Sequence, residues 1–206
     1  MTSAAHRPRR RLDPAVRRRE IVEAAARVFA RHDPGEVSFE VIAEEAGVSR
    51  SLVYSYFGDR GGLFAAAYSH ELERLDAAVD RALQTLGSDR DRVASAVSAY
   101  LDFARQHRQS LALIASASTS RHPAVRQAIR SRTDRIAAAV ADTPEARLLI
   151  HGIIGMVEAA AIHALESGDD DHDALVELLT QVIWDGVSSL DGAGLGDAGG
   201  GEGAPR

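Results

Sequence analysis

Apolar residues recur every three or four positions along most of this chain, which is the spacing of one face of an α-helix. The longest such stretch runs through Phe64, Tyr68, Leu72, Leu75, Val79, Leu83 and Leu86. The same period marks residues 14–33, 39–46, 50–57, 89–104, 111–114, 125–140, 144–165 and 172–190. No stretch shows a convincing alternation with period two, so the pattern predicts an all-α protein of about nine helices.

Start and stop signals support these helices. Asp13 and Thr143 each stand directly before a proline, a residue that favours the first position of a helix. Ser88 and Asp91 have the spacing of a capping box. Gly87 is predicted to end the long helix that follows residue 62.

Residues 38–64 predict a helix-turn-helix. Two short helices are joined at Gly47, where glycine permits the positive φ that such a turn often needs. Val48, Val53 and Phe57 are predicted to face inward and to fix the crossing of the two helices. The second short helix would then be presented outward, as a recognition helix is presented to the major groove of DNA.

Nine side chains of this segment are predicted to contact DNA: Ser38, Ser49, Arg50, Ser51, Leu52, Tyr54, Ser55, Tyr56 and Arg60. Arg50 can donate two hydrogen bonds to a guanine, and Leu52 can touch a thymine methyl group. The tyrosine hydroxyls, Arg60 and the helix start at Ser38 suit phosphates, which set the register rather than the sequence. The alternative for Leu52 is an ordinary place in the core.

The net charge of −6 is unusual for a DNA-binding protein, but the charge is unevenly distributed. Between residues 7 and 19 the one acidic residue is Asp13, whereas the basic residues are Arg7, Arg9, Arg10, Arg11, Arg17, Arg18 and Arg19. Residues 1–13 are therefore interpreted as a flexible basic arm, which either contacts DNA or is merely solvated. The Gly-rich residues 191–206 predict a disordered tail.

The composition also excludes several classes of site. The chain has no cysteine, so it has no disulfide, thiolate metal site or cysteine nucleophile. No apolar segment follows the basic N-terminus, so we expect no secretory signal. The most apolar stretch, residues 148–165, is interrupted by His151, Glu158 and His163 and is expected not to span a membrane. These features favour a cytoplasmic protein.

The helix-turn-helix contains a set of motif residues: Ile42-Ala43, Ala46-Gly47-Val48-Ser49, Tyr54, Tyr56-Phe57, Arg60 and Leu63-Phe64. This set resembles the signature of TetR-family transcriptional regulators. The match covers roughly residues 14–65, and beyond them only the helical layout and the length agree. The family usually has lysine at Arg60 and acidic residues at Gly61 and Gly62, and it often has threonine at Leu52. Two glycines at a helix start are expected to loosen the joint there, and Leu52 puts the family's base preference in doubt.

The resemblance implies a helix-turn-helix domain over residues 14–62 and a domain over residues 63–190 that binds a small molecule and dimerises. The last two long helices would pair with those of a second subunit in a four-helix bundle. The residues predicted to meet the partner are Gly152, Gly155, Ala159, Ile162, Val176, Leu179, Ile183 and Val187. The alternative is that these residues fill the core of a monomer.

Polar or aromatic residues on otherwise apolar helices are the candidates for a ligand pocket: Tyr100, Phe103, His107, His151, Met156 and Glu158. Core or interface roles for them are equally compatible with the pattern. A mainly apolar lining favours a hydrophobic or amphipathic effector, which would shift the dimer between two arrangements by tilting the long helix. The resulting hypothesis is a dimeric repressor that a small effector releases from a palindromic or near-palindromic DNA operator.

Other functional classes find less support. His70-Glu71 begins an HExxH pattern, but Arg74 occupies the place of the second metal ligand. The acidic run at residues 169–173 is expected to be a solvated loop and helix start rather than a metal site. We therefore expect no catalytic activity, no metal and no cofactor. A helical interaction module with a vestigial helix-turn-helix is the remaining alternative.

Overall fold

The computed structural model describes residues 13–84, 86–140, 143–168 and 171–191, and every regular element in this part of the chain is an α-helix. The helices are α1 (Pro14–Phe29), α2 (Phe39–Glu45), α3 (Arg50–Phe57), α4 (Arg60–Leu83), α5 (Asp89–Gln106), α6 (Arg108–Ser118), α7 (Pro123–Val140), α8 (Pro144–Ser167) and α9 (His172–Asp191). The all-α prediction is confirmed. The predicted arm and tail lie outside the described residues, except for Asp13 and Asp191.

The predicted helix starts are confirmed. The Asp13 carboxylate accepts a hydrogen bond from a backbone N–H in the first turn of α1 (2.8 Å), and the Thr143 hydroxyl does the same for α8 (3.2 Å). Ser88 and Asp91 form the reciprocal capping box that opens α5. Each bond satisfies an N–H group that has no partner within its own helix, so local chemistry sets where these helices begin.

Three helix limits differ from the prediction. α1 ends at Phe29, and residues 30–36 form turns instead of further helix. α4 ends at Leu83, so Leu86 lies beyond it and is 95% exposed. α6 extends on both sides of the predicted residues 111–114. Leu86 fits the apolar spacing of α4 although it lies past the last turn and is almost fully exposed, so the apolar period alone misplaces that end.

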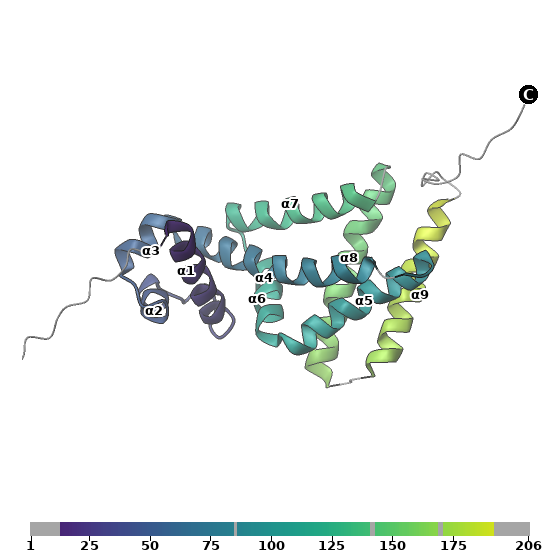
Figure 1. Ribbon diagram of the computed structural model, residues 1–206, viewed down its shortest axis with the longest axis horizontal. Coiled ribbons are helices and arrows are strands. Elements are labelled where there is room, and N and C mark those ends of the chain that lie inside the picture. The colour runs from purple at the N-terminus through teal and green to yellow at the C-terminus, as the bar shows by residue number, and fades with distance from the viewer. Residues whose placement is uncertain (1–12, 85, 141–142, 169–170, 192–206) are drawn as a thin grey trace, which may run out of the picture.

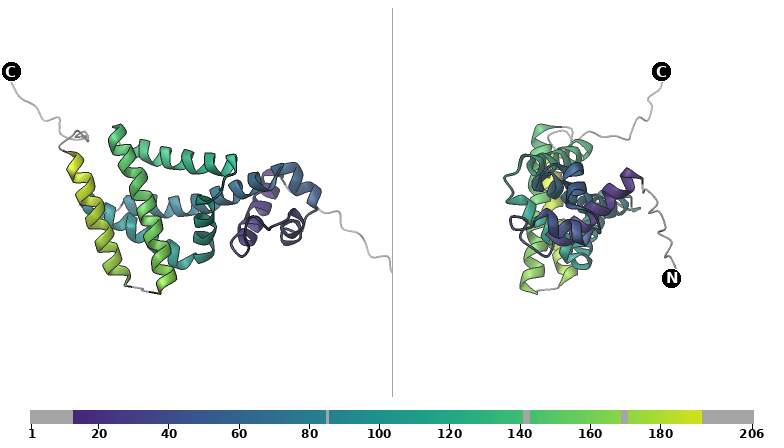
Figure 2. Two further views of the ribbon diagram at one scale, coloured as in Figure 1. Left: turned by 180° about the vertical axis from the view of Figure 1, so that it is seen from behind. Right: turned by 90° about the vertical axis from the view of Figure 1, so that its left-hand side faces the viewer.

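α4 connects the two ends of the molecule (Figure 1). At one end α1, α2 and α3 form a small unit around its start, and α5 and α7 pack along its length. α8 and α9 lie side by side at the end remote from α2 and α3 (Figure 2). A tilt of α4 would therefore move the helix-turn-helix relative to α8 and α9.

The hydrophobic core is continuous from α1 through α4 to α9. The rings of Phe29 in α1 and Phe64 in α4 meet edge to face, with centroids 5.0 Å apart, and both are buried. α4 begins at Arg60, so the predicted domain boundary after residue 62 falls within the first turn of a continuous helix. The division into two domains stays a prediction.

Candidate nucleic-acid interface

The turn between α2 and α3 positions the candidate recognition helix. Gly47 has a φ of +63°, a conformation that favours glycine, and the Val48 N–H donates to a carbonyl of α2 across the turn (2.9 Å). Ile42 and Val53 are fully buried in the core of this unit. Val48 and Phe57 are partly buried and pack against the same core. This packing leaves the opposite face of α3 outward.

Four of the predicted DNA contacts are exposed on α3: Arg50, Ser51, Tyr54 and Ser55. The ring of Tyr54 meets that of Phe39 edge to face, with centroids 6.3 Å apart, yet the residue is 63% exposed. The phenol is thus anchored against α2 while most of it stays in solvent. Such a side chain is well placed to donate its hydroxyl to a phosphate.

The other candidates on α3 also have structural tasks. The Ser49 hydroxyl caps the helix by accepting from the Leu52 N–H (3.3 Å), and it lies 3.1 Å from the Ser51 hydroxyl. Leu52 and Tyr56 are partly buried and pack against the core. The packing therefore favours the core alternative for Leu52, and only its exposed part is available to a thymine methyl group.

Glu40, which no motif in the sequence singles out, occupies the same surface. Its carboxylate lies 2.9 Å from the Arg50 guanidinium. Hydrogen bonds from its own backbone N–H and from the Ser38 hydroxyl, together with the charge of Arg50, lower the pKa of Glu40. Two predicted DNA contacts, Ser38 and Arg50, thus share one ionised partner in the DNA-free protein.

Arg60 ties the start of α4 to the helix-turn-helix. Its guanidinium donates to the backbone carbonyls of Gly35 and Val37, in the loop that leads into α2. One nitrogen of the side chain is therefore committed inside the protein. A phosphate contact by Arg60 stays a prediction that depends on its remaining N–H groups.

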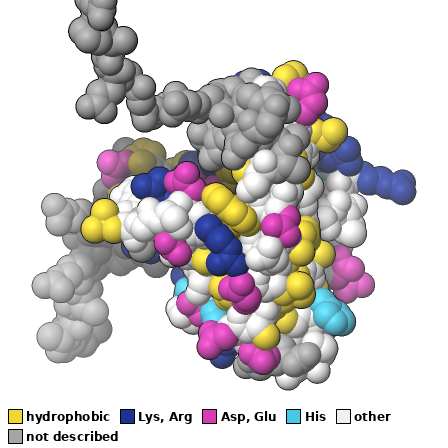
Figure 3. Space-filling view, turned by 90° about the vertical axis from the view of Figure 1, so that its right-hand side faces the viewer, with side chains coloured by type: hydrophobic (Ala, Val, Ile, Leu, Met, Phe, Trp, Pro, Cys, Tyr) yellow, Lys and Arg dark blue, Asp and Glu magenta, His cyan; other side chains and the backbone are white. Residues whose placement is uncertain are grey.

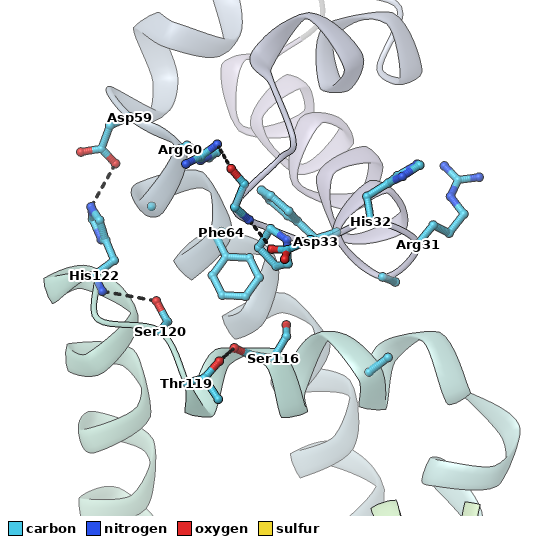
Figure 4. A pocket seen from close by; sticks show the side chains of 16 residues that line it. Arg31, His32, Asp33, Asp59, Arg60, Phe64, Ser116, Thr119, Ser120 and His122 are labelled. Atoms are coloured by element: carbon cyan, nitrogen blue, oxygen red, sulfur yellow. Dashed lines mark hydrogen bonds and ion pairs between the residues drawn. The ribbon is translucent and has the colours of Figure 1, made fainter. Parts of the chain in front are cut away.

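His122, just before α7, lies beside the start of α4 (Figure 4). A Cβ at Gly61 would overlap the His122 ring, and one at Gly62 would lie 2.7 Å from the Phe57 carbonyl oxygen. His122 Nε2 also lies 3.4 Å from the Asp59 carboxylate, which caps α4. The missing side chains of the two glycines allow this close approach, and the expectation that the glycines loosen the joint stays a prediction.

A cleft of about 850 Å³ opens beside this joint, between the loop after α1 and helix α6 (Figure 4). Its lining combines polar side chains such as His32, Asp33, Ser116 and Thr119 with the apolar rings of Phe29 and Phe64. None of the six predicted ligand residues belongs to this lining. The cleft is therefore distinct from the apolar pocket that the sequence predicts.

Two predicted ligand residues, Tyr100 and Glu158, interact inside the C-terminal domain, and burial raises the pKa of each. Both also interact with Arg132, whose guanidinium donates to Asp76 twice (2.7 and 3.0 Å to Oδ1). Burial raises the pKa of the nearby Tyr68 to about 12. We call these five residues the interior polar group. Sequence reasoning missed Asp76 and Arg132 because isolated charged residues on α4 and α7 resemble an ordinary solvated face, and it counted Tyr68 only as part of the apolar face of α4.

The other four ligand candidates do not belong to the interior polar group. The Phe103 ring is buried and lies 4.7 Å from that of His107, where α5 meets α6. His151 Nε2 lies 3.3 Å from the carboxylate of Asp134 in α7. Met156 is partly buried against the core. Roles in packing or in a surface ion pair account for Phe103, Met156 and His151, whereas His107 also lines a second cleft at the junction of α5 and α6.

The predicted dimer residues on α8 face largely outward. Gly152, Gly155 and Ala159 are exposed, and Ile162 is partly buried. A Cβ built on either glycine meets no atom within 4 Å. This face of α8 therefore has room for a helix of a second subunit to approach closely.

On α9 the prediction chose the wrong side. All four predicted residues pack against the core of their own protomer: Val176, Leu179, Ile183 and Val187. The outward side carries Leu178 and Val182, which are 60% and 48% exposed. Seen from the side on which α9 lies, hydrophobic side chains form a broken band among acidic ones (Figure 3). Because α9 is apolar on both sides, its period alone does not reveal which side faces the core.

Among the described residues, α8 is the one helix that is long and apolar enough to cross a membrane. Only 11% of its most apolar window is buried, and Leu148 is 73% exposed. An apolar surface of this kind commonly marks an interaction site. α9 adds its own exposed leucine and valine beside it, so both helices present apolar side chains on the surface.

Comparison with known proteins agrees with the geometry of the helix-turn-helix. A family model described as bacterial regulatory proteins, tetR family, matches residues 21–67. These residues extend from α1 into the first turns of α4 and include both short helices. The match therefore covers the part of the chain that places α3 outward.

Relatives that match over a longer stretch of the chain are named as regulators as well. The transcriptional activator FasR of Mycolicibacterium smegmatis is 27% identical over 190 residues, which cover 87% of each chain. The transcriptional repressor SCO4008 of Streptomyces coelicolor is 32% identical over 102 residues, about half of each protein. A solved TetR-like regulator from Rhodococcus sp. RHA1 has a TM-score of 0.66 at 27% identity, covering 86% of this chain and 99% of that one.

Proposed function

We propose that this chain, a transcriptional regulator of the TetR family, is a homodimeric repressor that leaves its DNA operator when a small molecule binds its C-terminal domain. The comparisons support a DNA-binding regulator rather than an enzyme. The homodimer, repression and ligand-induced release are the parts that we propose. Such a regulator would act in the cytoplasm, where the DNA is.

The outward face of α3 is the observation that carries this function. Buried Val53 fixes the helix from behind, while Arg50, Ser51 and Tyr54 stay exposed in front. A helix held in this way fits the major groove, with its first residues nearest to the base edges. Arg50 would read a guanine, and Tyr54 would hold a phosphate.

A second copy of the chain would complete the DNA-binding unit. The exposed apolar face of α8 and α9 supports pairing with the same face of a partner, because a two-fold interface uses one patch twice. Two recognition helices related by a two-fold axis require an operator with two related half-sites. We therefore expect a palindromic or near-palindromic operator that binds two chains.

The interior polar group supports an amphipathic effector. Tyr100 and Glu158 would meet the polar end of such a molecule, and the surrounding apolar helices would cover its hydrophobic part. Tyr68 and Asp76 belong to α4, the same helix that begins at the joint with the helix-turn-helix. A ligand that prefers one position of α4 would change the separation of the two recognition helices.

Fluorescence anisotropy with DNA from upstream of the gene tests this function. We expect saturation at two chains per site, with binding that weakens as salt rises because counterions leave the phosphates. Transcription in vitro from a promoter with the bound site tests the sign of regulation. Stimulation by the protein would contradict the repressor while leaving DNA binding intact.

A further inference from the structure

Arginine dominates a second, smaller cleft of about 380 Å³ between α1, α4 and the junction of α5 and α6. Arg27 comes from α1, Arg74 from α4, Arg105 from α5 and Arg108 from α6. Glu71 is the carboxylate among the described lining residues. No residue of α2 or α3 lines the cleft, so it is separate from the candidate DNA surface.

Glu71 does not neutralise the cleft as a whole, because its charge is already matched. Its carboxylate is buried, accepts from the Ser110 hydroxyl (2.6 Å) and lies 2.9 Å from the Arg74 guanidinium. These contacts join α4 to the first turn of α6. Glu71 is thus a structural link between α4 and α6.

Positive charge remains in excess when the neighbouring Glu45 is included. That carboxylate is shared by Arg27 (2.8 Å) and Arg31 (3.0 Å). Arg108 donates to the Leu165 carbonyl at 3.5 Å, which is a weak hydrogen bond. A guanidinium has five N–H groups, so several donors remain on Arg27 and Arg108 after these contacts.

The start of α6 adds to this positive field. The helix begins at Arg108 without a side-chain cap and without an acidic residue in its first turn. The residues of this turn, Arg108, Gln109 and Ser110, line the cleft. The helix dipole there favours a negative group, as the arginines do.

We propose that this cleft binds a small molecule that carries a diphosphate or phosphate-ester group. Arginine suits such a group because its planar fork pairs with two phosphate oxygens at once. Several phosphate oxygens would be needed to engage Arg27, Arg74 and Arg108, which come from three different helices. A carboxylate alone offers only two oxygens, so the arrangement favours a phosphorylated ligand.

The place of the cleft gives its occupant a structural consequence. Arg27 belongs to the helix that packs behind the helix-turn-helix, whereas Arg108 belongs to the C-terminal domain. A diphosphate bound between them would fix the angle at which the two parts meet. This consequence rests on the proposed DNA-binding function, whereas anion binding itself does not.

Isothermal titration calorimetry of the full chain with inorganic pyrophosphate, at constant ionic strength, tests the site. We expect one site per chain and an affinity at least about tenfold lower in the double variant Arg27→Gln/Arg108→Gln, because charge-assisted hydrogen bonds are lost. Arg126→Gln, on an exposed part of α7, is the matched control and should bind as the unaltered chain does. Thermal unfolding establishes that the double variant is folded.

Three results would overturn the proposal: no binding of pyrophosphate, equal binding by the double variant, or loss of binding in Arg50→Gln. The last result would place the anion on the DNA surface. Anisotropy with operator DNA at the same ionic strength separates this proposal from the proposed function. Pyrophosphate binding without operator binding would remove only the function, and the reverse would remove only the anion site.

Discussion

The guanidinium of Arg50, in the first turn of α3, lies 2.9 Å from the carboxylate of Glu40, in the first turn of α2. The candidate base-reading side chain therefore has an acidic partner before DNA arrives. Both side chains are more than half exposed, so the pair contributes little to folding stability. Its effect is expected in the choice between DNA sequences.

Glu40→Gln is expected to raise the affinity for scrambled DNA more than the affinity for the operator. The carboxylate repels phosphates on every sequence, whereas only a correctly placed guanine draws Arg50 away from it. On scrambled DNA, the slope of log affinity against log salt concentration should become steeper by about one, because Arg50 can then contact a phosphate. Glu73→Gln removes the same charge from an exposed part of α4 and should change neither value. Equal gains on both DNAs would mean that Glu40 has no part in selection.

Gly61→Ala is expected to destabilise the fold by no more than about 1 kcal/mol, because its methyl group would push the partly exposed His122 ring out of its contact with Asp59. Chemical denaturation measures this loss. His122→Ala should remove most of the overlap, so the double variant should lose less than the sum of the two single losses. Additive losses would contradict the contact between Gly61 and His122.

Leu178→Glu is expected to shift the protein from dimer toward monomer, because it places a charge in the apolar face of α8 and α9. Light scattering after size-exclusion chromatography measures the change in mass. Val41→Glu, at an exposed apolar position of α2, is the matched control and should leave the dimer intact. A dimer that tolerates Leu178→Glu would place the interface on another surface.

Glu158→Gln is expected to stabilise the protein more at pH 8 than at pH 5. Burial raises the pKa of Glu158, so the folded state binds its proton more tightly than the unfolded state, whose value is about 4.3. The folded chain with Glu158 therefore loses stability as the pH rises from that value through the folded pKa, and glutamine removes this loss. Thermal unfolding of both chains at the two pH values measures it. If the two chains differed in stability by the same amount at pH 5 and at pH 8, ionisation of Glu158 would cost the folded state nothing.

Local chemistry explains what the sequence predicted well. The helix starts at Asp13, Ser88 and Thr143 depend on residues within one turn of each other, so a pattern of single letters reveals them. The turn at Gly47 is equally local. Together with the apolar period, these signals placed the helices and the candidate recognition helix.

Contacts between distant segments explain what the sequence missed. Glu40 reaches Arg50 only because α2 and α3 cross, and Arg132 reaches Asp76 across two helices far apart in the chain. The fit of His122 over Gly61 likewise joins segments about sixty residues apart. Such pairings have no periodic signature, so only the packed structure brings them together.

The central claim is that α3 selects DNA sequence through Arg50. Anisotropy with operator and scrambled DNA, for the unaltered chain and for Arg50→Ala, tests it most directly. Because a good arginine–guanine pair contributes about 1–3 kcal/mol of discrimination, the operator affinity should fall about 5- to 150-fold. The affinity for scrambled DNA should fall much less, and thermal unfolding should be unchanged because the side chain is 69% exposed. An equal loss on both DNAs, or no loss on the operator, would contradict the claim.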